Sequence, residues 1–222
     1  RLKNFGDKYD IEKKNRYDDY DKILMCEEID AIYISTLNNT HAEIIMKAID
    51  AKKNILCEKP MATNFSDTIK IFNKLKKSKV FFLEAIAYRS HNQTKFLVNK
   101  IMDDEIGEIK SIESTFGFFS RKINPKSRLF NFDLGGGAIL DVGCYPVSFS
   151  VLIGGLKQIN LSEAEILNVK GSICETGVDE IAYATLSFEK KLTAKIGTAI
   201  RLQMQNQTKI IGTKGNILVN NP

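Results

Sequence analysis

Short apolar runs separated by helix-like stretches dominate the first 85 residues. The strand-like runs lie at residues 29–35, 54–57 and 80–85, and each is nearly continuous in apolar and β-branched residues. Strands of this kind, each followed by a helical stretch, favour a parallel sheet covered by helices on both faces. The first part of the chain is therefore expected to be an α/β unit of the Rossmann type.

The two stretches between these strands have helical spacing. Ala42, Ile45, Met46 and Ile49 recur at i, i+3, i+4 and i+7, which predicts one apolar face of a helix over residues 41–51. The second helix is expected to start after Asn64, an N-cap residue type with Asp67 three positions later.

The character of the chain changes after about residue 92. A helix is predicted over residues 96–102, ending near Gly107, and a strand over residues 110–119. Longer runs of alternating residues come after it, at residues 163–169, 180–188, 192–201 and 208–211. A hairpin turn is expected at Lys190-Lys191, between the second and third of these runs. We therefore expect two domains, residues 1–92 and 93–222, the second α+β with a mainly antiparallel sheet.

Composition narrows the class of protein. A hydrophobic content of 43% with 27% charged residues is that of a soluble globular chain. We find no apolar run near the roughly 20 residues that a bilayer requires, and the opening residues do not resemble a secretory signal. The net charge of +5 is modest, and lysines alternate with acidic residues. This pattern indicates a solvated surface and no nucleic-acid partner.

The cysteines and histidines give no metal-site pattern. Cys26, Cys57, Cys144 and Cys174 include no Cys-x-x-Cys pair, and the chain has two His, so we expect no metal site. Cys57 and Cys144 lie in apolar stretches and are expected to be buried thiols, which suits a reducing cytoplasm.

The triplet Glu58-Lys59-Pro60 comes directly after the second strand. Ligands of open parallel sheets bind beyond the carboxyl ends of the strands. Pro60 disfavours the helical conformation at Lys59 and permits a cis peptide, so the lysine is held at the strand tip. Beside a partly desolvated cleft, the pKa of such a lysine can fall toward neutrality, which suits a proton donor or acceptor. A surface lysine in a turn remains the alternative interpretation.

A glycine-rich segment, residues 135–146, forms the second constellation. It lacks the G-x-G-x-x-G fingerprint, because Leu140 stands at the third glycine position. Triple glycine permits a close backbone approach at a helix start. Asp141 and Tyr145 are four residues apart, so on a helix they share a face and could orient a hydroxyl substrate and relay its proton. An ordinary capped helix with an exposed Asp and Tyr remains possible.

Together these motifs resemble the glucose–fructose oxidoreductase / inositol dehydrogenase (Gfo/Idh/MocA) family. The resemblance covers essentially the whole chain and rests on the order and spacing of five motifs: residues 29–36, Asn38-Asn39-Thr40-His41, residues 57–62, Glu84-Ala85 with Tyr88-Arg89, and residues 135–146. The Tyr145-Pro146 ending is most similar to the branch with dimeric dihydrodiol dehydrogenases and NADP-dependent xylose dehydrogenases.

The resemblance implies an enzyme that uses NADP or NAD. Lys59 would be the catalytic lysine, Tyr145 the acid/base group whose pKa Lys59 lowers, and Asp141 a residue that orients the substrate or supports Lys59. Glu58 and Pro60 would shape the cofactor cleft, and Arg89 would lie near the cofactor. The pyrophosphate and nicotinamide-ribose side would be lined by Thr36, Asn38 and His41.

The chain departs from the family pattern in two places. Leu37 stands where the family often has proline. The family also opens with a strand, a glycine-rich turn, a helix and a second strand, and by this alignment residues 1–9 already belong to the helix after that second strand. We therefore expect a fragment that lacks this opening segment, with its NAD/NADP determinants, and the end of the second sheet.

Three functions remain open at this point. The first is a dehydrogenase or reductase acting on a sugar, polyol or dihydrodiol, which is expected to be cytoplasmic and dimeric. The second is a non-catalytic nucleotide-binding sensor on the same fold, and the third is an unrelated lyase or sugar-binding protein. Retention of Lys59, Asp141 and Tyr145 favours the first, and Arg121, Asn124 and Arg128 are candidate substrate contacts.

Overall fold

The computed structural model describes residues 2–156, 164–188 and 192–220. The chain divides into two compact units, Arg1–Ala85 and Ile86–Pro222, whereas the sequence predicts a boundary near residue 92. The turn predicted at Lys190-Lys191 lies outside the described residues.

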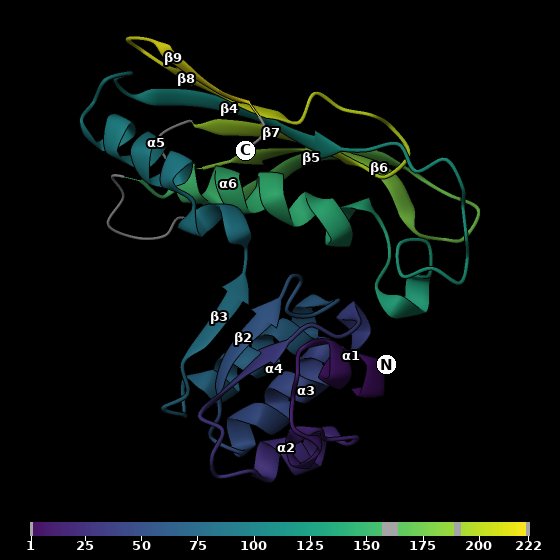
Figure 1. Ribbon diagram of the computed structural model, residues 1–222. Helices are drawn as coiled ribbons and strands as arrows, with labels where there is room; N and C mark the ends of the chain where they lie inside the picture. The colour runs from purple at the N-terminus through teal and green to yellow at the C-terminus, as the bar shows by residue number, and fades with distance from the viewer. Residues whose placement is uncertain (1, 157–163, 189–191, 221–222) are drawn as a thin grey trace. The chain divides into compact units, whose positions relative to one another are not determined.

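The first unit is built on a parallel sheet in the order β1 (Ala31–Ile34), β2 (Asn54–Glu58) and β3 (Phe82–Ala85); Figure 1 labels β2 and β3. The register pairs Ile34 with Cys57, and Glu58 with Ala85. The carboxyl ends of the three strands therefore meet at one edge of the sheet, which confirms the predicted Rossmann-type arrangement.

The helices of the first unit fill its core. They are α1 (Leu2–Lys8), α2 (Tyr20–Met25), α3 (Asn38–Asp50) and α4 (Phe65–Leu75), with a one-turn 3₁₀ segment at Lys13–Asn15. Ile45 of α3 and Ile71 of α4 are fully buried against Ile55 of β2. The predicted cap of α4 is confirmed, since the Asn64 side chain accepts a hydrogen bond from the Asp67 amide at 2.9 Å.

One face of this sheet is open in the described structure. Tyr33, Leu56 and Leu83 are 57%, 39% and 50% exposed. The expectation of a sheet covered on both faces is therefore wrong for the described residues. The apolar runs do not distinguish a strand buried on both faces from one buried on a single face.

The second unit is a six-stranded sheet in the order β5-β6-β7-β4-β8-β9. Its strands are β4 (Ile109–Gly117), β5 (Glu165–Ile173), β6 (Asp179–Ser187), β7 (Thr193–Ala199), β8 (Gln207–Gly212) and β9 (Asn216–Asn220). Within this sheet, β4–β7 is the only parallel pair among the described strands, which confirms the mainly antiparallel sheet. The sequence pattern does not predict β9, which forms a hairpin with β8.

Two helices, α5 (Asn92–Met102) and α6 (Cys144–Gly154), cover one face of this sheet (Figure 1). Ile101 and Ile153 are buried with Ile112 and Ile210 from the strands. Single 3₁₀ turns lie at Ala87–Ser90 and Phe132–Leu134, and a π-helical turn, Ile139–Gly143, leads directly into α6.

The segment Phe132–Gly154 corrects one expectation. It is 23 residues long, and an 18-residue window within it has a mean hydropathy of 1.5, so by length and composition it could cross a membrane, although no such segment was expected. In the structure, 61% of that window is buried inside the protein. A buried core helix passes the same test, so the segment is weak evidence for a membrane span.

Candidate active site

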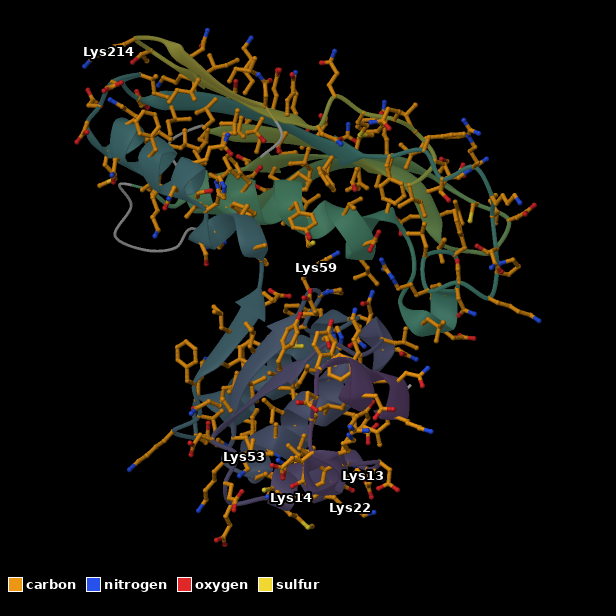
Figure 2. All side chains as sticks on the ribbon, viewed as in Figure 1. Lys13, Lys14, Lys22, Lys53, Lys59 and Lys214 are labelled. Atoms are coloured by element: carbon orange, nitrogen blue, oxygen red, sulfur yellow. The ribbon has the colours of Figure 1, made fainter. Side chains whose placement is uncertain are left out.

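Lys59 comes directly after β2 and lies at the carboxyl end of the parallel sheet, where Figure 2 labels it at the end opposite Lys53. The side chain is half-buried, and the Lys59-Pro60 peptide is cis. The structure therefore places Lys59 at the strand tip, where ligands of parallel sheets bind.

Three side chains from three different elements hold the residues on either side of Lys59. The Pro60 carbonyl oxygen lies 2.8 Å from Nδ1 of His41, and the Met61 amide donates to Oε1 of Glu84 at 2.8 Å. The Tyr33 hydroxyl donates to the Glu58 carboxylate, and this bond raises the pKa of Tyr33. The corner after β2 is therefore fixed on both sides of the lysine.

His41, which was expected to line the cofactor side of the site, lies in the interior of the first unit. Its side chain is fully buried, and Nε2 lies 3.2 Å from the Thr36 carbonyl oxygen. Both neighbours are carbonyl acceptors, so a ring nitrogen of His41 that carries a hydrogen can donate to the one beside it. His41 therefore connects the loop after β1 to the corner after β2 through its contacts with the Thr36 and Pro60 carbonyl groups.

The start of α3 suits an anionic group of a cofactor. Leu37 occupies the N-cap and supplies no side-chain cap, and Asn38 begins the helix. The amides and the positive end of the dipole at such a helix N-terminus favour phosphate. Thr36, with its hydroxyl 2.7 Å from that of Thr40, precedes this helix. The described residues therefore fit a dinucleotide at the carboxyl edge of the first sheet.

The cysteines divide by burial. Cys57 is fully buried, and burial raises the pKa of its thiol to about 12. Cys144 is half-buried, so the expectation of a buried thiol is wrong at this position. A neutral, inaccessible Cys57 fills the core and carries no chemistry.

Asp141 and Tyr145 lie in the second unit, in the π-helical turn and in the first turn of α6. Asp141 is 6% exposed, and its Oδ1 accepts from Nη1 of Arg128 at 2.8 Å. The Tyr145 ring packs edge-on against Phe116, with the ring centroids 5.3 Å apart. The unit therefore presents a fixed carboxylate and a phenol on one continuous helical segment.

The partner of Asp141 was not foreseen. From the sequence, Arg128 is predicted to be a substrate contact. The sequence pattern contains no signal that pairs a loop arginine with a carboxylate 13 positions later. In the structure its guanidinium is joined to Asp141.

Arg89 contacts α6 within the second unit. Its Nη2 donates to the Ser148 carbonyl oxygen at 3.1 Å, and the Tyr88 hydroxyl lies 2.9 Å from the Ser148 hydroxyl. These bonds tie the 3₁₀ turn before α5 to the helix that carries Tyr145.

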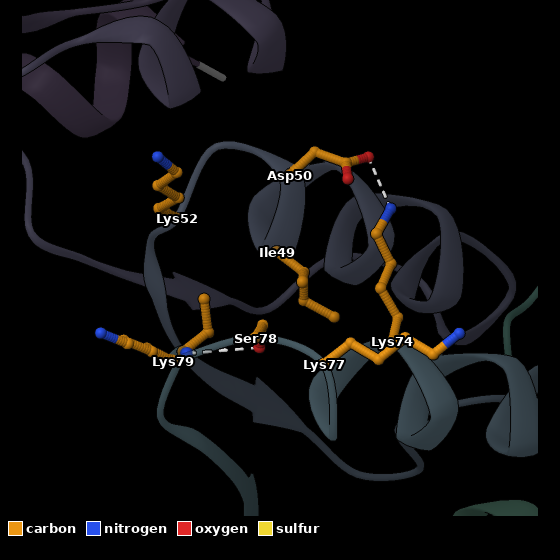
Figure 3. Close-up of a pocket in the computed structure, with 8 residues that line it drawn as sticks. Ile49, Asp50, Lys52, Lys74, Lys77, Ser78 and Lys79 are labelled. Atoms are coloured by element: carbon orange, nitrogen blue, oxygen red, sulfur yellow. Dashed lines mark hydrogen bonds and ion pairs between the residues drawn. The ribbon is translucent and has the colours of Figure 1, made fainter.

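A cavity of about 570 Å³ lies at the amino ends of the strands of the first unit, away from Lys59. Its lining residues are Ile49, Asp50, Lys52, Lys74, Lys77, Ser78, Lys79 and Val80. Figure 3 shows Lys52, Lys77 and Lys79 directed away from the centre of the cavity, while Lys74 pairs with Asp50 at 2.6 Å. This cavity is distinct from the edge that bears Lys59. Among the described residues no cluster of three potential metal ligands occurs.

Comparison with known proteins matches both units. The family model "Oxidoreductase family, NAD-binding Rossmann fold" matches residues 1–86, and "GFO/IDH/MocA C-terminal domain" matches residues 96–218. Both domains are therefore represented among the matched residues.

Two curated relatives share one name, trans-1,2-dihydrobenzene-1,2-diol dehydrogenase. The Xenopus tropicalis protein is 32% identical over 99% of this chain and 63% of its own length. The Homo sapiens protein is 28% identical over 100% of this chain and 64% of its own length. The chain thus spans somewhat less than two thirds of these relatives.

Solved structures share the fold. An aldose-aldose oxidoreductase from Caulobacter crescentus, complexed with glycerol, has a TM-score of 0.88 at 24% identity, covering 99% of this chain and 65% of its own. A 3-ketoreductase from Actinomadura kijaniata, in complex with NADP and TDP-benzene, has a TM-score of 0.84 at 23% identity, covering 99% and 64%. These likenesses show the fold, and the two family models show that the chain belongs to the Gfo/Idh/MocA family of oxidoreductases.

Proposed function

We propose that the chain serves an NAD(P)-dependent oxidoreductase that transfers a hydride between a nicotinamide cofactor and the CH–OH or carbonyl carbon of a sugar, polyol or dihydrodiol. The observation that carries the proposal is Lys59, held at the carboxyl end of β2 by contacts to Pro60, Met61 and Glu58 in a chain of this family. The names of the relatives support a small hydroxylated substrate.

Each residue has a role that its chemistry allows. The nicotinamide, when bound, accepts or supplies the hydride. Lys59 orients the reacting group and holds a proton at Nζ, while Tyr145 donates or accepts the substrate hydroxyl proton at its phenol oxygen. Asp141 orients the substrate hydroxyl. The cofactor contacts are assigned to Thr36, Asn38, Glu58, Pro60 and Arg89, with His41 acting from beneath.

NADP is proposed as the preferred cofactor over NAD. The NADP-bound 3-ketoreductase and the likeness to the NADP-using branch support this choice. Initial rates with each cofactor at equal concentrations decide it, and a higher kcat/KM for NAD would reverse the preference.

The first test is a substrate screen of the purified chain. Xylose, glucose, inositol and trans-1,2-dihydrobenzene-1,2-diol are offered with each cofactor, and cofactor reduction is monitored by absorbance. We expect turnover with at least one substrate and a loss of about 10²- to 10⁴-fold in kcat for Lys59→Ala. Lys79→Ala, an exposed lysine beside the separate cavity, is the matched control.

Nucleotide binding without turnover, together with no effect of Lys59→Ala, would favour the non-catalytic sensor. Absence of both binding and turnover would refute either function on this fold.

We further propose a cytoplasmic homodimer with no nucleic-acid or membrane partner. The open sheet face opposite α5 and α6, where the Tyr183 side chain is 45% exposed, supports the dimer. Light scattering of Tyr183→Asp tests the dimer, which the substitution is expected to dissociate.

Four free cysteines support the reducing compartment, and cell fractionation tests it.

A further inference from the structure

The peptide between Ala138 and Ile139 is held at both of its polar atoms. The Ile139 amide donates to Oδ2 of Asp179 at 2.7 Å, and the Ala138 carbonyl accepts from the Thr198 hydroxyl at 3.2 Å. Asp179 begins β6 and Thr198 lies near the end of β7. Side chains from β6 and β7 therefore hydrogen-bond to the same peptide group at the start of the π-helical turn.

Gly137 is shaped by the same carboxylate. Its φ is +110°, and a Cβ added there would lie 2.2 Å from Oδ1 of Asp179. No side chain fits in that space, and φ in this region disfavours residues other than glycine. The third glycine of the glycine-rich segment is therefore explained by Asp179, 42 positions later in the chain.

The hydrogen-bonded peptide between Ala138 and Ile139 lies where the helical segment begins, so its position affects the geometry of that segment. The π-helical turn Ile139–Gly143 carries Asp141 and passes directly into α6, whose second residue is Tyr145. A π-helical turn changes the rotation of each later side chain relative to an α-helix, and such turns are frequent at functional sites. The directions of Asp141 and Tyr145 thus depend on where this turn starts.

We propose that Asp179 is a positioning residue: with Thr198, its carboxylate fixes the start of the π-helical turn and so sets the orientation of Asp141 and Tyr145. The proposal rests on the function proposed above, because it assigns Asp179 to the same reaction. Asp179 acts through the helical segment and contributes no proton to the substrate.

The energetics fit a residue kept for position. Burial raises the pKa of Asp179, while hydrogen bonds from the backbone of Ile139, of Asp179 itself and of Ala138 lower it, and burial dominates. A carboxyl group with a raised pKa in the fold stabilises the fold below its unfolded pKa and loses that contribution as pH rises through the folded pKa, so ionising the group costs stability. Such a cost is common where function needs the group.

Asp179→Asn is the discriminating variant. An asparagine keeps one acceptor oxygen and removes the desolvated charge, but its NH₂ group opposes one of the two amides. We expect a fold at least as stable as the wild type, with a looser turn. Thr198→Val removes the hydroxyl at constant shape and is the second variant. Glu180→Gln, the next carboxylate on the same strand, bonded to Ser172, is the control.

Two readouts test the proposal. Amide hydrogen exchange over residues 138–145 should accelerate by about tenfold in Asp179→Asn and Thr198→Val but not in Glu180→Gln. In steady-state kinetics kcat should fall by about 10- to 100-fold, while KM for the cofactor stays within about twofold.

Unchanged exchange, or faster exchange with unchanged kcat, would overturn the positioning role. If the wild type shows no turnover with any substrate, the proposed function has failed and with it the catalytic part of this inference. Hydrogen exchange would then still decide whether Asp179 holds the turn.

Discussion

At the scale of single residues, the chain places its ionisable groups in contrasting environments. Asp141 is almost completely buried and paired with a half-exposed arginine, whereas Cys57 has its pKa raised to about 12 by burial. The first arrangement keeps a charge in the interior, and the second keeps a thiol neutral. Both have measurable consequences.

Removing the guanidinium from Asp141 should destabilise the fold. Arg128→Ala leaves a buried carboxylate without its charge-assisted hydrogen bond, and we expect the free energy of unfolding to fall by about 1–3 kcal/mol. Urea denaturation measures this, with exposed Lys126→Ala in the same loop as the control. In an Asp141→Asn background the loss should shrink. An equal loss in both backgrounds would mean that Arg128 stabilises the loop independently of Asp141.

The Cys57 thiol should make stability fall at alkaline pH. The unfolded chain releases this proton near pH 9, whereas the folded chain holds it to about 12, so the folded state binds the extra proton between these values. The contribution of Cys57 is complete below pH 9 and falls by up to roughly 4 kcal/mol by pH 12. Comparing the wild type with Cys57→Ala from pH 8 to 11 isolates this contribution. Parallel curves for the two proteins would contradict it.

At the scale of elements, caps and turns determine where the helices begin. The Asn64 side chain accepts from the Asp67 amide, and Asp67 lies in the first turn of α4. Asp179 plays the corresponding part for the segment that carries Asp141, but from a distant strand.

The local cap gives a direct prediction. Asn64→Ala should lower the free energy of unfolding by about 1 kcal/mol, because the first turn of α4 loses its side-chain acceptor. Thermal unfolding measures the change, and Asn64→Asp, which keeps an acceptor, should retain most of the stability. Equal losses in the two variants would show that the cap is not the cause.

The contrast between these two caps explains what could be predicted from the sequence. Asn64 and Asp67 are three residues apart, so local pattern is sufficient to predict the cap and the helix. The strands of the parallel sheet and the position of Lys59 also result from local periodicity and from Pro60. Asp179, Arg128 and Glu84 meet their partners through the fold, and their sequence separations carry no signal. The π-helical turn and β9 were missed because neither has a hydrophobic period of its own.

At the scale of the whole molecule, the two units carry different parts of the proposed chemistry. The first presents Lys59 and the uncapped start of α3 at the carboxyl edge of a parallel sheet. The second presents Asp141 and Tyr145 on a helical segment whose start is hydrogen-bonded to side chains of β6 and β7. The family models that match the units agree with this division between a dinucleotide-binding domain and a second domain.

Hydride transfer is the central chemistry proposed for this chain, and isotope tracing tests it most directly. The purified chain is incubated with oxidised cofactor and with xylose or the dihydrodiol deuterated at the reacting carbon, and the reduced cofactor is examined by mass spectrometry. We predict deuterium on the nicotinamide ring, in amounts that fall in parallel with kcat in Lys59→Ala. Reduced cofactor without deuterium, or no reduced cofactor with any substrate of the screen, would contradict hydride transfer.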